Sequence, residues 1–107
     1  MASNPFHQHV LAQLRGLGPT LRSRAMFGAH GLYLGDVFFA IAWRGQLYFK
    51  TTPATAARYI ARGSEPFQPS PTIKLKNYYE VPESVIERPD ELLAWALEAV
   101  DIGGGKK

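Results

Sequence analysis

Residues 24–50 read RAMFGAHGLYLGDVFFAIAWRGQLYFK, and this stretch decides the fold class. Aromatic and aliphatic residues alternate in it with small or polar ones, and glycines interrupt the alternation. Because successive side chains of a strand point to opposite faces, a period of two lets each run present one face to a core. Gly35-Asp36 and Arg44-Gly45 stand where short hairpin loops are expected. The stretch therefore predicts an antiparallel meander with strands near 30–34, 36–43 and 46–51.

The chain before the meander predicts one helix and one further strand. Asn4-Pro5 is typical of an N-cap followed by the first helical residue. Apolar residues then recur at helical spacing until glycines stop the helix, at Phe6, Val10, Leu14 and Leu17. Residues 21–27 alternate small or apolar residues with Arg22 and Arg24, which predicts a half-buried strand with arginines on its outer face.

The chain after the meander predicts a helix and then a loop. Thr52-Pro53 opens the helix by the same cap-and-proline pattern, and Gly63 ends it. Its apolar face is thin and consists mainly of Ala57, Tyr59, Ile60 and other alanines. Residues 64–72 contain three prolines and cannot pair as a central strand, so they predict a loop that is fixed in place if Phe67 enters the core.

The last third of the chain predicts one more strand and the clearest helix. Ile73 and Leu75 alternate with Lys74 and Lys76, which predicts a strand with a basic outer face. Residues 77–81 either extend or bend this strand, Pro82 closes it, and one helical turn over 83–87 follows. The final helix begins at Pro89 with two acidic residues in its first turn, where carboxylates oppose the helix dipole. Its apolar stripe comprises Leu92, Leu93, Ala96, Leu97 and Val100, with Trp95 beside it as a packing anchor. A glycine run predicts a flexible tail from about residue 103.

This order of elements predicts a two-layer α+β domain. The antiparallel sheet should have four to six strands, with the helices on one face. The 107 residues fit a single domain spanning 1–107, without a linker or an internal repeat.

Composition excludes several classes of protein. With 46% hydrophobic and 20% charged residues, the chain resembles an ordinary globular domain and is not extensively disordered. No apolar run approaches the length that spans a bilayer, and the N-terminus is not a convincing secretory signal. The absence of cysteine excludes disulfides, a thiolate nucleophile and a cysteine-type zinc site. We therefore expect a cytoplasmic protein without membrane contact.

Charge is distributed unevenly along the chain. Residues 1–76 carry nine basic and two acidic residues, whereas residues 77–105 carry seven acidic residues and one basic residue. In one interpretation, the acidic segment folds over the basic sheet and neutralises it. In the other, the molecule has a basic and an acidic pole that suit a partner or self-association.

Residues that could support catalysis or bind a metal do not form a recognisable set. His7 and His9 lie two apart on a predicted helix and cannot share a metal, and His30 stands at a turn. Ser23 and Ser64 lack a base and an orienting group at any useful spacing. We expect no catalytic residues, no cofactor and no metal.

The strongest set of polar residues outside the core is basic and lies on strands: Arg22, Arg24, Lys74 and Lys76. Strand-borne cations between aromatic residues can contact phosphates, which predicts a nucleic-acid or partner surface. Ordinary sheets also keep a solvent-exposed face soluble with lysine and arginine, and the sequence leaves both interpretations open.

Five separated motifs carry a family resemblance. They are Met26-Phe27-Gly28-x-x-Gly31-Leu32-Tyr33, Leu47-Tyr48-Phe49-Lys50, Gly63-Ser64-Glu65-Pro66-Phe67, Tyr78-Tyr79-Glu80-Val81-Pro82 and Pro89-Asp90-Glu91-Leu92-Leu93-x-Trp95. In this order they resemble the N-terminal domain of the TfoX/Sxy competence regulators, over roughly residues 22–100. Ala29 is a departure, because the family often has a second glycine there. The resemblance implies a bacterial α+β domain in which the motif residues are mostly structural: Met26, Phe27, Gly28, Gly31, Lys50, Gly63, Glu65, Phe67, Tyr79 and Trp95.

The resemblance implies a non-enzymatic regulatory module. Such a module would act in transcriptional control of competence genes through a protein partner, with weak DNA contact as an addition. Full-length regulators of this family carry a second, C-terminal domain, and we expect this chain to be a stand-alone N-terminal domain. Two alternatives are a structural homodimer that uses charge polarity or a strand edge, and a small-ligand binder or enzyme with an apolar pocket lined by Tyr33, Tyr48 and Tyr79.

Overall fold

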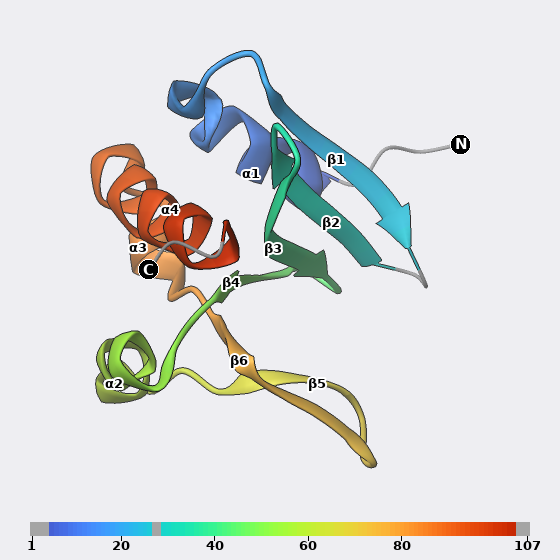
Figure 1. Cartoon of the computed structure of the whole chain (residues 1–107), viewed down its shortest axis with the longest axis vertical. Helices are drawn as coiled ribbons and strands as arrows, with labels where there is room; N and C mark the ends of the chain where they lie inside the picture. The colour runs from blue at the N-terminus through green and yellow to red at the C-terminus, as the bar shows by residue number, and fades with distance from the viewer. Residues whose placement is uncertain (1–4, 27–28, 105–107) are drawn as a thin grey trace.

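The computed structural model describes residues 5–26 and 29–104, which form one antiparallel sheet with helices against it (Figure 1). The helical segments are α1 (Pro5–Gln13), the 3₁₀ turn η1 (Arg15–Leu17), α2 (Pro53–Ala61), α3 (Glu83–Ile86) and α4 (Pro89–Gly103). The strands are β1 (Leu21–Met26), β2 (Ala29–Leu34), β3 (Val37–Trp43), β4 (Gln46–Lys50), β5 (Pro66–Ser70) and β6 (Ile73–Glu80). Their order in the sheet is β1-β2-β3-β4-β6-β5. The predicted α+β class is confirmed, as are the meander and the helices after it.

Local sequence signals account for the ends of these elements. The Thr52 side chain accepts a hydrogen bond from the Thr55 backbone, and the Thr55 hydroxyl accepts one from the Thr52 backbone, which forms a capping box at the start of α2. The turn between β3 and β4 places Arg44 at a φ of 51° and Gly45 at 77°. Two positive φ values in succession match the twist of a tight hairpin, which explains why the loop is this short.

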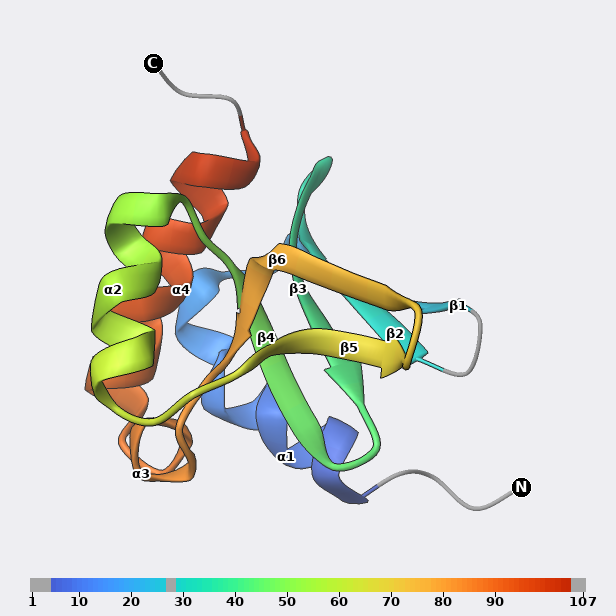
Figure 2. The same cartoon turned by 90° about the horizontal axis from the view of Figure 1, so that it is seen from below.

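The helices cover one face of the sheet, which we call the helical face. Figure 2 shows α2, α3 and α4 together on this side, and α4 makes its main contacts with β3 and β4. The largest core cluster lies between the layers and includes Val10, Leu14, Phe39, Phe49, Tyr59, Leu92, Trp95 and Ala96. The predicted helical layer is thus confirmed, and Trp95 is 6% exposed, as expected of a packing anchor.

Two helices are rotated from their predicted orientation. In α4 the buried residues are Leu92, Trp95, Ala96 and Ala99, and Leu97 is 51% exposed although it was expected in the stripe. In α2 the buried residues are Ala56 and Tyr59, whereas Ala57 and Ile60 are exposed. The reason is the contact between the two helices, because Tyr59 and Trp95 meet edge to face with ring centroids 4.7 Å apart.

A β-bulge interrupts the period of two in the meander. Leu32 pairs with Ala40 and Tyr33 pairs with Phe38, so Phe39 is an extra residue on β3. Phe39 and Ala40 consequently both enter the helical core, whereas Phe38 packs with the second cluster, on the opposite face. The alternating pattern of residues 36–43 therefore did not predict that two successive side chains would lie on the same face.

The two edge strands differ from their predictions. Residues 66–70, expected in a loop, form β5 and pair with β6, because prolines are tolerated at a sheet edge. Phe67 is buried as expected, but in a second cluster outside the helical core. Conversely, β1 was expected to be half-buried, yet Ser23 and Ala25 are exposed as well as the arginines. The reason is its position at the other edge of the sheet.

The ends of the chain are only partly described. Helix α4 continues through Gly103, and residues 105–107 of the predicted tail lie outside the described residues. Phe27 and Gly28 lie outside them too. None of the described helices is long and apolar enough to span a membrane.

Replacement of Trp95 by alanine should lower the free energy of unfolding by about 3–5 kcal/mol, because it removes a buried aromatic side chain and leaves a cavity. Urea unfolding monitored by circular dichroism measures this change. Leu97→Ala is the matched control on the same helix, and we expect a loss within about 0.5 kcal/mol for this exposed position. Equal losses for the two variants would contradict the assignment of Trp95 as the anchor of α4.

Candidate interaction surface

The face of the sheet opposite the helices, here called the open face, carries a row of paired residues from five strands. Arg24 pairs with Gly31, Gly31 with Ile41, Ile41 with Tyr48, and Tyr48 with Glu80. Directly paired residues share a face of a sheet. The row therefore runs from an arginine at the β1 edge, across a glycine and two apolar side chains, to a carboxylate on β6.

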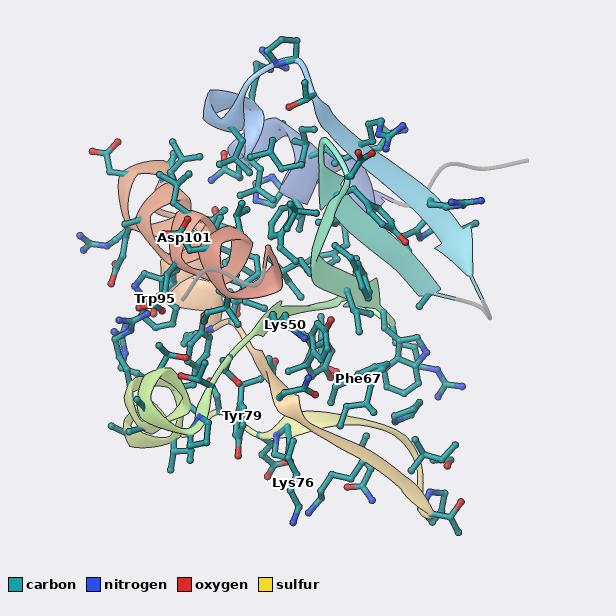
Figure 3. The ribbon with its side chains drawn as sticks, in the orientation of Figure 1. Lys50, Phe67, Lys76, Tyr79, Trp95 and Asp101 are labelled. Carbon is teal, nitrogen blue, oxygen red and sulfur yellow. The ribbon has the colours of Figure 1, made fainter. Side chains whose placement is uncertain are left out.

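The β5–β6 hairpin lies across this open face. Phe67 of β5 contacts Trp43 edge to face, with ring centroids 5.3 Å apart, and lies 4.8 Å from the ring of Tyr48. These residues form a second cluster with Ala29, Ile41, Tyr78 and Phe38. In Figure 3, Phe67 lies on this side of β6, whereas Tyr79 points toward α2 and the side of Trp95. The hairpin thus forms a small core of its own on the open face.

An apolar groove opens beside this cluster. It has a volume of about 350 Å³ and is lined by Ala29, Ile41, Trp43, Phe67, Pro69, Ile73 and Leu75. The lining residues of β2, β3 and β5 are buried or half-buried, but Ile73 is 51% exposed and Leu75 is 36% exposed. We call this feature the apolar groove.

The four strand-borne basic residues are all exposed, but they do not form one row. Arg22 and Arg24 lie on β1, at one edge of the sheet, and Lys74 and Lys76 lie on β6. Three strands separate β1 from β6, which corresponds to about 19 Å along the sheet. Figure 3 likewise shows Lys76 on the hairpin, away from β1.

Other cations lie closer to the aromatic residues of the open face. The Arg44 guanidinium lies 4.8 Å from the ring centre of Trp43, and the Lys50 ammonium lies 5.0 Å from that of Tyr78. Arg22 donates a hydrogen bond to the Gly35 carbonyl and lies 3.8 Å from Asp36. Within the described part of the chain, no carboxylate lies within 4.0 Å of the charged groups of Arg24, Arg44, Lys50, Lys74 and Lys76.

The acidic C-terminal segment makes its ion pairs among the helices. Glu98 pairs with Arg58, Glu91 lies 3.7 Å from Arg62, and Glu87 lies 3.1 Å from His9. Arg58 also lies 4.4 Å from the ring centre of Trp95. The carboxylates of α4 therefore pair with arginines in α2 and at its C-terminal end, and α4 packs on the face of the sheet opposite Arg24. In one of the two interpretations of the charge pattern, the acidic segment neutralises the strand-borne basic residues. The ion pairs of the described residues do not support this interpretation.

A polar hollow of about 530 Å³ adjoins the groove and shares Trp43 with it. In it, Tyr48 donates a hydrogen bond to the Gln46 side-chain oxygen, and the Gln46 amide donates one to Glu80. Burial, reinforced by the charge of Glu80, raises the pKa of Tyr48 to about 12. A phenol with this pKa stays protonated at neutral pH and cannot act as a general base.

The pocket expected from three tyrosines does not form. Tyr33 stacks on Phe38 with centroids 5.1 Å apart, and it and Tyr48 belong to the open face. Tyr79 instead packs toward Tyr59, on the helical face. The described residues also contain no group of three histidine, aspartate or glutamate side chains that could hold a metal. The described side chain of His9 pairs with Glu87, while that of His7 lies outside the described residues.

The sequence model of the TfoX N-terminal domain family matches residues 12–102. The chain belongs to this family. No curated protein sequence matches the chain.

The residues of the TfoX motifs are spread over the fold. Gly63, with a φ of 85°, lies just past the end of α2 and requires glycine. Gly31 and Phe67 belong to the open face, while Tyr79 and Trp95 belong to the helical core. Glu65 is exposed, and the Lys50 ammonium lies over the Tyr78 ring. The side chain of Met26 and the whole of Phe27 and Gly28 lie outside the described residues.

Sequence reasoning missed Trp43, Ile73 and Leu75 as surface residues. The alternation of Ile73 and Leu75 with two lysines predicts a strand whose outer face is basic, whereas Ile73 and Leu75 are exposed as well. A usable signal was present, because the proline-rich neighbour of this strand has only one large apolar side chain, Phe67, with which to cover it.

The titration of Tyr48 predicts a pH effect on stability. Its pKa rises from 10.0 to about 12 on folding, so the unfolded chain loses the proton first as the pH rises. The free energy of unfolding should therefore fall between about pH 10 and 12. Urea unfolding at about pH 8 and pH 11 should show a smaller decrease for Tyr48→Phe than for wild type. An equal decrease in the free energy of unfolding of both proteins would contradict the raised pKa of Tyr48.

Proposed function

We propose that this TfoX N-terminal domain is a non-enzymatic regulatory module of the bacterial cytoplasm that acts by binding a protein partner through its open face. The main observation in support of this proposal is that the ion-paired helices and the open face lie on opposite sides of the sheet. On the helical side, Glu91 and Glu98 of α4 lie beside Arg62 and Arg58. The open face keeps exposed apolar side chains beside Arg24 and Arg44, which have no carboxylate within 4.0 Å among the described residues.

Family membership supports a regulatory role, and the polar side chains of the open face do not favour catalysis. Tyr48 is held protonated, and its partners Gln46 and Glu80 are engaged with each other. Exposed apolar patches larger than isolated residues are typical of protein-interaction sites. DNA contact would be a weak addition, because the four strand-borne cations form two separate pairs rather than one continuous track.

Photo-crosslinking in the source bacterium tests this proposal. A benzophenone-bearing amino acid placed at Ile73, on the open face, should crosslink to one predominant protein. The same amino acid at Leu97, on α4, is the matched control, because both positions are 51% exposed. Transcript profiles of a deletion strain should also change and be restored by the wild-type gene. The absence of a protein crosslink at Ile73, or crosslinks to nucleic acid alone, would contradict partner binding, and an unchanged profile would contradict regulation.

A structural homodimer is a second candidate, favoured by the β1 edge. The other edge strand, β5, contains Pro66 and Pro69, which lack the N–H needed for pairing. Strand β1 contains no proline and is exposed on both faces over Ser23–Ala25. A dimer formed by backbone pairing should persist in about 1 M salt, where exposed ion pairs are screened. Light scattering on a sizing column at low and high salt measures this, and a monomer under both conditions excludes the candidate.

A further inference from the structure

The apolar groove has a fixed floor and an exposed wall. Ala29, Ile41 and Phe67 form the floor and are 6–8% exposed, so folding already holds them in place. Ile73 and Leu75 form the wall on β6 and remain half-exposed, although Leu75 pairs with the buried Phe67. A surface held in its binding conformation loses little conformational entropy when a ligand binds.

Trp43 supplies a rigid aromatic side chain at one end of the groove. Phe67 contacts it edge to face, and the Arg44 guanidinium lies over its ring. These two contacts hold the indole from two sides, and part of it remains accessible. Tryptophan in such a setting is typical of the residues that contribute most to binding energy at interfaces.

The charges around the groove are mainly positive. Arg44 covers Trp43, and Arg24 follows Ile41 in the row of the open face, with only Gly31 between them. Neither guanidinium has a carboxylate within 4.0 Å among the described residues. Glu65 and Glu80 lie beyond Trp43, in the adjoining hollow, where Lys74 is also present and Glu80 accepts a hydrogen bond from Gln46. Charge complementarity therefore favours an acidic ligand.

We propose that the apolar groove binds a peptide segment of a partner protein in which apolar anchor residues are flanked by aspartate or glutamate. This inference rests on the proposed function and names the chemistry of its partner. The anchors bury Ile73, Leu75 and the accessible part of Trp43, while the flanking carboxylates meet Arg24 and Arg44. Apolar burial supplies most of the affinity, and the charges supply specificity and association rate.

A displayed library of random twelve-residue peptides, selected on the purified chain, tests the proposal. We expect the enriched sequences to combine leucine, isoleucine or aromatic anchors with acidic neighbours. The best peptide is then labelled and titrated by fluorescence anisotropy. Binding should weaken about tenfold or more for Ile73→Ser. Leu97→Ser should bind like wild type, because it removes an equally exposed apolar side chain far from the groove.

Charge is tested by a second matched pair of variants. The double variant Arg24→Gln/Arg44→Gln should bind the selected peptide several-fold more weakly, and the loss should diminish as salt is added. Arg15→Gln/Arg88→Gln changes the net charge equally at exposed positions away from the groove and should have little effect.

Several outcomes overturn the proposal. Enrichment of basic peptides, no enrichment above background, or equal binding by Ile73→Ser and wild type each excludes an acidic peptide in the groove. A dimer in light scattering that Ile73→Ser dissociates assigns the groove to a second copy of the chain. The three peptide-binding outcomes do not bear on the crosslink to a cellular protein or on the transcript profile, so the broader function can survive the loss of this inference. Conversely, a selected peptide without any cellular crosslink would overturn the broader function.

Discussion

Helix α4 and the central strands β3 and β4 share one buried core, and the other elements are arranged around this contact. Leu92, Trp95 and Ala96 pack on the side of the sheet that carries Phe39 and Phe49. The bulge at Phe39 matters here, because it adds a second successive side chain to this face. Trp95 then positions α2 through Tyr59, and Arg58 covers its outer surface. Burial of these large apolar side chains is the main favourable term in the stability of the domain.

The same contact separates the charges of the molecule. Because α4 lies on the helical face, its carboxylates meet the arginines of α2 rather than those of β1. Exposed ion pairs of this kind contribute little stability. These pairs do determine where the charge lies, because they keep the paired carboxylates of α4 on the side of the sheet away from Arg24. The open face thereby combines uncompensated positive charge with apolar side chains.

The β5–β6 hairpin gives this open face its shape. It brings Phe67 onto Trp43 and Tyr48, but it leaves Ile73 and Leu75 only partly covered. Exposure of Ile73 and Leu75 contributes nothing to the core of a small domain. The proposed binding role gives a reason for this exposure. The proposed interaction rests on this groove and its cations, while in the neighbouring hollow Tyr48 stays protonated at neutral pH and Gln46 donates a hydrogen bond to Glu80.

Local periodicity, turn residues and caps predict the α+β class and the order of most elements, and the sequence motifs carry the TfoX resemblance. The Thr52 cap, the Arg44-Gly45 turn and the start of α4 at Pro89 all formed where local chemistry predicted them. Tertiary structure alone decided which faces of α2 and α4 are buried, where the bulge lies, and that residues 66–70 form an edge strand. It also decided the apolar groove, whose residues on β2, β3, β5 and β6 are distant in the chain. The physical reason is that sheet order and register depend on pairing between remote segments, and no local pattern records which apolar side chains those pairings leave uncovered.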